Sequence, residues 1–506
     1  MTRCARCDAE VPEAGRFCPA CGHAVSDSLS RLPTEMGASP KPVSTDPARS
    51  ERRFLLLLLG LLTASYFAFG GYRNWPYKIE SDGKYYYQYL VSAIYDGDLD
   101  FANQYRIPKY PWMKTEIDHY RFRDSVSPVT GRPANVFWPG SALLWFPFFA
   151  VSWLLGTLLN AVGLAVDMNP FGRWFQFGVM VAGPAYAALA LVLLGRLLSR
   201  LRLLSVASSR LALVLILFAS PLYYYAVFEP SMSHVNDLLV FVVYLLAVFR
   251  WVERGRLSDL AALSLAGGLL ILVRSQNAAT VALFSLVLFF LPARPDPKGA
   301  PVAFHRLRRL AGCALPLLFG VLPILALNRY LYGGAFVVRG AGNSLDFAHP
   351  KLFGVLFSAR NGLFSHHPLL LVGLAGFVWL LASRPVELPR WFLWTLLGTF
   401  LVQVWVNASV HDWWGGHSFG QRKLLSSLPL FALGLAFLLE KIRRRSGDRF
   451  TRPVLAMAAV TMALGFYLVL IHVFVWSYDE PHDVFKWMFV KIPSKVLGKL
   501  LAGRAG

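Results

Sequence analysis

Residues 54–71 read FLLLLLGLLTASYFAFGG, a run without a charged side chain that directly follows Arg52 and Arg53. A helix of about 20 apolar residues spans the hydrocarbon core of a bilayer. Further charge-poor apolar stretches lie at roughly 141–166, 174–195, 211–228, 235–249, 258–273, 277–292, 311–327, 367–383, 391–410, 424–439 and 454–476. We therefore predict an all-α polytopic membrane protein with about 11–13 transmembrane helices.

The composition of the 506-residue chain agrees with a membrane protein. Hydrophobic residues make up 56% and charged residues 16%, against about 25% charged in soluble chains, and the mean hydropathy is +0.47. The 50 Lys and Arg outnumber the 29 Asp and Glu, which gives a net charge of +21. In a membrane protein such an excess is typical of cytoplasmic loops. We therefore expect membrane lipid, and no nucleic acid, as a partner.

Basic loops predict the orientation. Arg52 and Arg53 place the N-terminus in the cytoplasm, so that residues 54–71 act as a signal anchor in the inner membrane. Four further basic clusters are expected inside: Arg196, Arg200, Arg202 and Arg210; Arg254 and Arg256; Arg306, Arg308 and Arg309; and Lys441, Arg443, Arg444 and Arg445. The segments 72–137, 332–366 and 409–423 then face outward.

One count does not fit this orientation. Residues 138–195 hold two apolar stretches, whereas an outward 72–137 and an inward 196–210 need an odd number of crossings. A re-entrant stretch, three short helices, or a basic loop on the outside would each resolve it. The expected transmembrane domain as a whole covers 51–480, and an amphipathic tail follows at 481–506.

The N-terminus carries two C-x-x-C knuckles. They place the thiols of Cys4, Cys7, Cys18 and Cys21 as a closed four-sulfur site, which suits structural zinc. The alternative is a pair of redox disulfides. We predict a cytoplasmic zinc ribbon at 1–25, since thiolate ligands need a reducing compartment, followed by a disordered linker at 26–50, which is rich in Ser, Pro, Thr and Ala.

Polar residues gather in the segments expected to face outward. The first, 72–137, interleaves Tyr, Trp and Arg with Glu80, Asp82, Asp96, Asp98, Asp100, Glu116, Asp118 and Asp124. Acids at such a surface act as general bases or metal ligands, and Arg grips phosphate, although single acids more often only solvate a loop. Arg274 lies between two apolar stretches, where it needs either an anionic ligand or an interhelical ion pair. The string VHDWWGGHSFGQRK, from residue 410, is the most site-like stretch, or else an aromatic belt at the interface.

The order of several strings resembles a known superfamily. ESDGKYYYQYL and GDLDF come after the first helix, then NVFWPGSALLWFPFF, SPLYYYAVFEPSMSH, LVRSQN, LFSARNGLFSHHPLL and WWGGHSFGQRKLL. Together they resemble the GT-C superfamily of multi-spanning glycosyltransferases, which includes protein O-mannosyltransferases and the bacterial aminoarabinose transferase. The resemblance covers roughly residues 54–440 and leaves the ribbon outside. It implies transfer of a sugar from a polyprenyl-phosphate donor, at the outer face, to an unknown glycan, lipid or protein acceptor.

The resemblance also implies site residues. Asp82 corresponds to the acid that serves these enzymes as base or metal partner, although S-D-G stands where many relatives have a D-E pair, so a divalent cation stays open. Of the tyrosines 85–87, we expect one or two to pack against the membrane and one to face a sugar. The candidate substrate-binding residues are Tyr86, Arg274, His367, Trp414 and Arg422.

Two other functions remain open at this stage, a transporter or flippase of lipid-linked glycans and a sensor that uses the ribbon as an adaptor. Should Asp82 not be the base, Asp98, Asp100 and then Asp412 are the next candidates.

Overall fold

The computed structural model describes residues 2–3, 10–11, 47–70, 79, 81–102, 104, 126–201, 203–291, 302–337, 345–385, 388–416, 418–446, 451–474 and 483–494. The chain divides into two compact units, residues 1–50 and 51–506. In the first unit, strand β1 (Thr2–Arg3) pairs antiparallel with β2 (Glu10–Val11). The four cysteines of the predicted zinc ribbon and most of the linker 26–50 lie outside the described residues.

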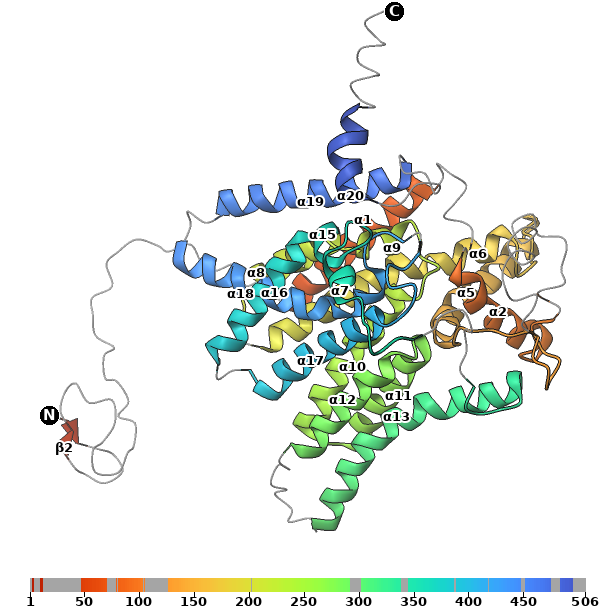
Figure 1. The fold of residues 1–506 in the computed structure, drawn as a ribbon, viewed down its shortest axis with the longest axis horizontal. Helices are drawn as coiled ribbons and strands as arrows, with labels where there is room; N and C mark the ends of the chain where they lie inside the picture. Colours follow the sequence, from red (N-terminus) through yellow and green to blue (C-terminus); the bar gives the residue numbers. More distant parts are fainter. Residues whose placement is uncertain are drawn as a thin grey trace, which may run out of the picture. The chain divides into compact units, whose positions relative to one another are not determined.

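The regular elements described in the second unit are all helices (Figure 1). In chain order its elements are α1 (Pro47–Gly70, which begins in the first unit), α2 (Asp82–Val91), η1 (Ser92–Asp96), α5 (Gly140–Ala161), α6 (Arg173–Met180), α7 (Ala182–Arg200), α8 (Val206–Phe218), α9 (Leu222–Val227), α10 (His234–Arg254), α11 (Leu257–Val273), α12 (Asn277–Phe290), α13 (Val302–Tyr332), α14 (Leu352–Phe357), α15 (Leu363–His366), α16 (Pro368–Ser383), α17 (Arg390–Ala408), η2 (Arg422–Ser427), α18 (Leu428–Ser446), α19 (Thr451–Phe474), α20 (Val484–Lys486) and η4 (Trp487–Lys491).

The apolar stretches of the sequence form these helices. Eight helices in the described residues are long and apolar enough to cross a membrane, and α8, α11, α12 and α16 are shorter apolar helices. The prediction of an all-α, multi-pass membrane protein is therefore confirmed. In the long α13, Pro316 and Pro323 occupy interior positions, which membrane helices tolerate because neighbouring groups satisfy the freed backbone carbonyls.

The basic loops meet at one end of the helices, which we call the basic end. Arg200 at the end of α7 pairs with Glu253 of α10 at 3.2 Å. Arg444 of α18 donates to the carbonyl of Leu203, just before α8, at 3.0 Å. Arg308 of α13 lies over the ring of Trp251. The loops that the sequence assigned to one side of the membrane thus lie together.

The other ends of the same helices gather the polar strings, and we call this the site end. Helix α10 runs from His234 at the site end to Arg254 at the basic end, and its 21 residues span about 30 Å, the thickness of a bilayer core. Leaving α5 aside, the apolar helices alternate in direction between the two ends along the chain. Helix α17, for example, starts at the basic end, where Trp391 packs on Phe249, and carries Gln403 towards the site end.

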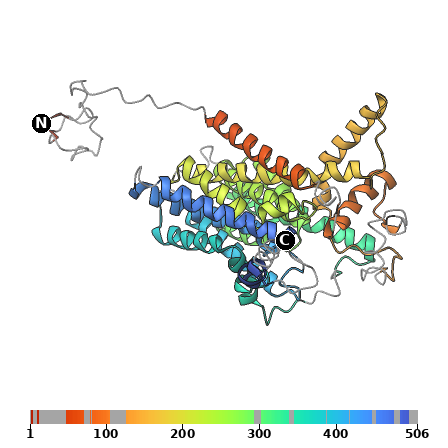
Figure 2. The ribbon, with the colours of Figure 1, turned by 90° about the horizontal axis from the view of Figure 1, so that it is seen from above.

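The paths of α5 and α6 bear on the odd count expected between 138 and 195. Helix α5 starts beside the C-terminus of α11, where a Cβ on Gly140 would lie 2.3 Å from the backbone nitrogen of Val273. Helix α7 also starts at the site end, with Gly183 against Pro230. Between them, α5 leaves the bundle and α6 packs back along it (Figure 2). The two helices therefore form a hairpin that begins and ends at the site end, and only α7 continues to the basic end.

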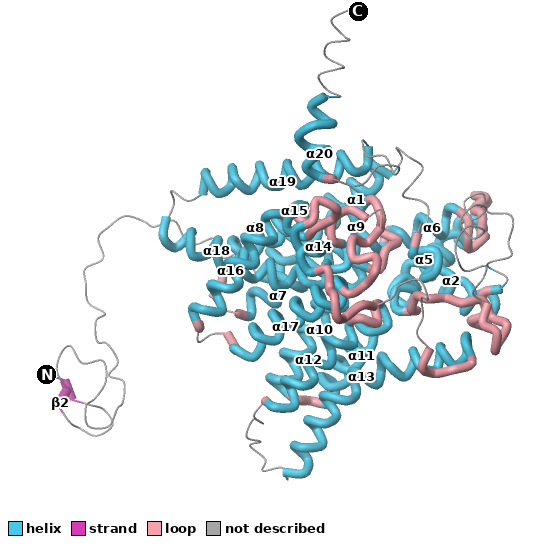
Figure 3. Tube along the Cα trace, viewed as in Figure 1, coloured by secondary structure: helices cyan, strands magenta, loops and turns pink. Residues whose placement is uncertain are grey.

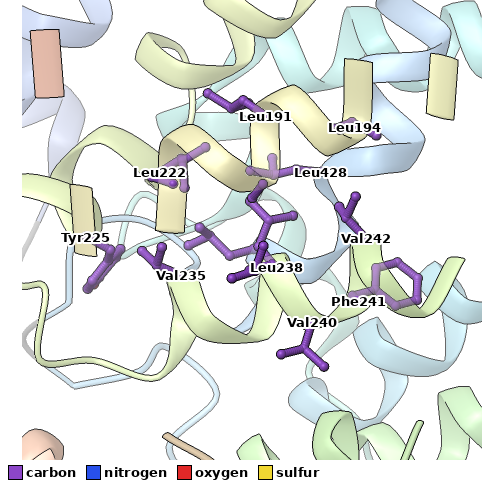
Figure 4. Packing of buried hydrophobic residues seen from close by; sticks show 14 of the residues in the cluster. Leu191, Leu194, Leu222, Tyr225, Val235, Leu238, Val240, Phe241, Val242 and Leu428 are labelled. Carbon is purple, nitrogen blue, oxygen red and sulfur yellow. The ribbon is translucent and has the colours of Figure 1, made fainter. Parts of the chain in front are cut away.

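The core lies where α7, α9, α10 and α18 cross. Figure 4 shows Leu191 and Leu194 of α7, Leu222 and Tyr225 of α9, and Leu428 of α18 around α10. These side chains are at most 1% exposed. Because α9 and the first turn of α10 belong to this rigid core, the residues of the site end that rest on them are held in fixed positions.

The predicted C-terminal tail also reaches the site end. The backbone nitrogen of Val484 donates to the carbonyl of Ala359 at 3.3 Å. Val484 and Trp487 are buried, whereas Phe485 and Phe489 are exposed. The described part of 481–506 thus packs one face on the protein and leaves apolar side chains exposed on another, and the amphipathic character expected of the tail stays a prediction.

Candidate functional site

Asp82 is the first residue of α2, in the segment that the sequence presented as a long outward loop. Ser81 precedes it with φ 50°, a left-handed conformation that strains a residue with a side chain and that recurs at functional sites. Gly83 follows it, and a Cβ there would lie 2.5 Å from Cβ of Ser231. The S-D-G string therefore holds the start of α2 tightly against the loop that precedes α10.

The three tyrosines after Asp82 pack into protein. Tyr85 stacks on Phe137, and the hydroxyl of Tyr87 donates to the carbonyl of Pro170. Tyr86 donates to the hydroxyl of Ser233 at 3.1 Å. All three rings are buried in contacts with α5 and its flanking loops. The expectation that one or two of them pack against the membrane is therefore wrong. This burial explains why YYYQYL forms a helix.

The polar strings bring three cations near Asp82 from two distant parts of the chain, residue 274 and residues 422–423. Nη2 of Arg422, at the start of η2, lies 3.6 Å from Oδ2 of Asp82. Lys423 lies within electrostatic range of Asp82, Arg422 and Arg274. The side chain of Asp82 keeps 29% of its surface exposed and that of Arg422 keeps 14%. A partly open carboxylate thus faces a cluster of three cations, Arg274, Arg422 and Lys423, which we call the cation cluster.

Tyr86 records the same charges. Burial first, and the carboxylate of Asp82 second, raise the pKa of Tyr86 to about 12, while Arg274 and Arg422 act in the opposite direction. The phenol therefore stays protonated at neutral pH and can only offer a neutral hydrogen bond. Asp82, Arg274 and Arg422 thus all lie within electrostatic range of this hydroxyl group.

Arg274 belongs both to an ion pair and to the cation cluster. Nη1 donates to Nδ1 of His234 at 2.8 Å, Nη2 donates to Gln276 at 3.2 Å, and Nε lies 3.9 Å from Oδ2 of Asp237. Arg is always a donor, so Nδ1 of His234 accepts and its proton sits on Nε2. The interhelical ion pair considered for Arg274 is present, and 15% of its side chain remains exposed for a ligand.

His367 lies beside the site as a neutral ring. It is 2% exposed and packs against Phe419 and Gly420, which has φ +60° and where a Cβ would lie 2.6 Å from Nε2 of the imidazole. Burial lowers the pKa of His367 to about 3. It can therefore contact a phosphate only as a neutral hydrogen-bond donor, and the prediction that it binds phosphate stays a prediction in that form.

Trp414 lies in a turn next to the cation cluster. The backbone nitrogen of Gly416 donates to Oδ1 of Asp412 at 2.9 Å, and Lys423 donates to the carbonyl of Asp412. Arg360 lies 4.3 Å over the ring of Trp414. Figure 3 shows loops of the site end beside α9 and α15. The turn thus places the half-buried ring of Trp414 near Lys423. The cation that stacks on this ring is Arg360, and the ring does not contact Asp82.

The next candidates for the base, Asp98, Asp100 and Asp412, lie at different distances from Asp82. Asp98 accepts from Ser92 at 2.9 Å, and Asp100 lies 3.9 Å from Arg132. They follow α2 and η1, whose 10 and 5 residues carry the chain about 20 Å from Asp82. Asp412 acts on Lys423, so it lies closer to the cation cluster and becomes the next candidate after Asp82.

Sequence reasoning gave no role to several residues of the site. His234 and Lys423 stand in the quoted strings, and Glu229 acts on Arg422. Gln403, a buried amide in the apolar α17, was overlooked although a polar side chain in a membrane helix is itself a signal.

The zinc prediction lies outside what the structure describes, because its four cysteines are not among the described residues. Glu80, the acid nearest to Asp82 in the sequence, is not among them either. Among the described side chains, no three of His, Cys, Asp or Glu form a group that could hold a metal ion. That a divalent cation assists at Asp82 therefore stays a prediction.

No protein-family model matches the chain, and no curated protein matches it.

Proposed function

We propose that this protein transfers a sugar from a polyprenyl-phosphate donor to an acceptor at the outer face of the inner membrane. The observation that carries the proposal is the 3.6 Å pair of Asp82 and Arg422 inside the cation cluster. Glycosyl transfer from a lipid phosphate needs one carboxylate base and cations for the departing phosphate. The resemblance to the GT-C superfamily adds the sugar donor.

In the proposed reaction the carboxylate and the cations have different roles. Asp82 takes the proton from the acceptor hydroxyl as that oxygen attacks the anomeric carbon. The sugar–phosphate bond breaks, and its electron pair leaves with the phosphate. Arg422, Arg274 and Lys423 stabilise the negative charge that grows there. The protonated Tyr86 lies within electrostatic range of the base and of two of the cations, and it can donate to the donor sugar or its phosphate only by releasing Ser233.

A transporter or flippase of lipid-linked glycans is the alternative function. Transporters hold their polar sites near the bilayer midplane on interrupted helices. Here Asp82, Arg422 and Arg274 lie at helix termini of the site end, at the start of α2, the start of η2 and the end of α11. This location favours a reaction at the membrane surface.

Reconstitution into liposomes separates the two functions. Purified protein is given a polyprenyl-phosphate sugar labelled in the sugar, together with membrane extract as a source of acceptors. A transferase moves label from the lipid to a second product. A flippase instead makes the labelled lipid accessible on the other leaflet without a new product, and that result would replace the proposal.

A further inference from the structure

Five side chains form a closed ring at the site end. Nη2 of Arg274 donates to Gln276 at 3.2 Å, and Gln276 donates to Oε1 of Gln403 at 2.7 Å. Gln403 donates to Oδ1 of Asn277 at 3.3 Å, and Asn277 donates to Oδ1 of Asp237 at 2.6 Å. Oδ2 of Asp237 lies 3.9 Å from Nε of Arg274 and closes the ring. The ring ties together α10, α17 and the segment between α11 and α12.

The ring is buried on one side and open on the other. Asp237, Asn277 and Gln403 are each 1% exposed, whereas the side chain of Arg274 is 15% exposed. A buried amide that loses its partner carries a desolvation penalty of about 1–3 kcal/mol. Each amide in the ring is therefore held in one orientation by its neighbour. The last of these neighbours is Arg274, whose side chain is held in the same way.

The ring also decides which hydrogens of Arg274 remain for a ligand. A guanidinium has five N–H groups. One hydrogen on Nη2 goes to Gln276, one on Nη1 goes to His234, and Nε faces Asp237. One hydrogen on each terminal nitrogen is left over. Two hydrogens on a fixed plane are what a bidentate contact to a phosphate needs.

We propose that Gln403 is a positioning residue that, through Gln276 and Asn277, fixes the guanidinium plane of Arg274 toward the phosphate of the donor lipid. The proposal rests on the proposed function, because it takes the anion at Arg274 to be a polyprenyl phosphate. Gln403 itself does not touch the ligand. Its effect must therefore depend on Arg274, which a merely structural role would not require.

A double-mutant cycle tests this dependence without using catalysis. A fluorescent polyprenyl monophosphate is titrated against the full-length protein in nanodiscs, for wild type, Gln403→Leu, Arg274→Ala and the double variant. The substitution at 403 removes no charge. We expect it to weaken binding about fivefold, the size of a coupling between neighbours, and to have no further effect once Arg274 is alanine. In an Arg422→Ala background the fivefold loss should persist.

Two further variants keep the test sharp. Thr399→Val is the matched control, because Thr399 lies one turn away on α17, is 4% exposed, and has a hydroxyl without a hydrogen-bond partner among the described residues; it should bind like wild type. Gln276→Leu breaks the next link at a half-buried position and serves if Gln403→Leu does not fold. Thermal unfolding in detergent checks each protein.

The outcomes separate the two proposals. If Arg274→Ala binds the lipid normally, the phosphate site is misplaced and the proposed function loses its donor site. If Arg274→Ala weakens binding but neither glutamine variant does, the positioning role is wrong and the donor site stands. An equal loss with and without Arg274 would also overturn the positioning role.

Discussion

Replacing Arg422 by alanine is expected to weaken binding of the donor lipid. Nη2 of Arg422 lies 3.6 Å from Asp82, and its side chain is 14% exposed. Two unit charges at that distance attract by about 4–5 kcal/mol at an effective dielectric constant of 20, an upper limit because water reaches Asp82. A charged hydrogen bond from the same guanidinium to a phosphate contributes about 1.5–3 kcal/mol, so Kd should rise about 10- to 150-fold.

The assay is titration of a fluorescent polyprenyl monophosphate against the protein in nanodiscs. Arg422→Lys should lose less, since it keeps the charge but not the planar fork. Arg132→Ala is the matched control: Arg132 also pairs with an acid, Asp100, at 3.9 Å, but stacks on Tyr330 and lies outside the cation cluster. A folded Arg422→Ala protein that binds the lipid as tightly as wild type would refute the reasoning.

Three other predictions concern the ribbon, the orientation and the pH dependence of stability. The reduced protein should contain about one zinc per chain, and Cys18→Ser should lose the metal but still insert into the membrane; metal analysis without zinc would contradict this. A cysteine at position 82 should react with an impermeant reagent from outside, whereas cysteines in the basic loops 196–210, 294–310 and 441–452 should react only after the inner face is opened. Burial lowers the pKa of His367 to about 3 in the folded protein. As the pH falls, the imidazole of His367 therefore takes up a proton in the unfolded chain before it does so in the folded protein. Stability should therefore fall by about 1.4 kcal/mol per pH unit below about 6.5, and His367→Gln should flatten that fall in unfolding measured between pH 7 and pH 5.

The sequence was sufficient for the helices, because apolar runs between basic loops have few other solutions in a bilayer. It also named Asp82 and Arg422, whose partnership at 3.6 Å brings together residues 340 positions apart. It did not show that α5 and α6 form a hairpin that returns to the site end. The close approaches of Gly140 to Val273 and of Gly183 to Pro230 bring the chain to the site end before and after this hairpin, and no periodicity reports such contacts.

The remaining differences between the sequence-based predictions and the structure are due to burial of side chains. The string after Asp82 looks like a solvated loop because it is rich in polar and aromatic residues, but its tyrosines pack on Phe137 and against the carbonyl of Pro170. His367 looks like a cation in sequence, whereas its surroundings keep it neutral. Gln403 was missed because its partner, Gln276, lies 127 residues away, and such pairings appear only once the helices are packed.

Whether Asp82 is the base of a glycosyl transfer can be measured with a single substitution. Wild type and Asp82→Asn proteins are incubated with a labelled polyprenyl-phosphate sugar and membrane extract, and initial rates of label transfer are compared at saturating donor. The substitution keeps the size of the side chain and removes its basicity. We expect transfer to fall about 10²- to 10⁴-fold while donor binding is little changed. An Asp82→Asn protein that transfers sugar at the wild-type rate would contradict it.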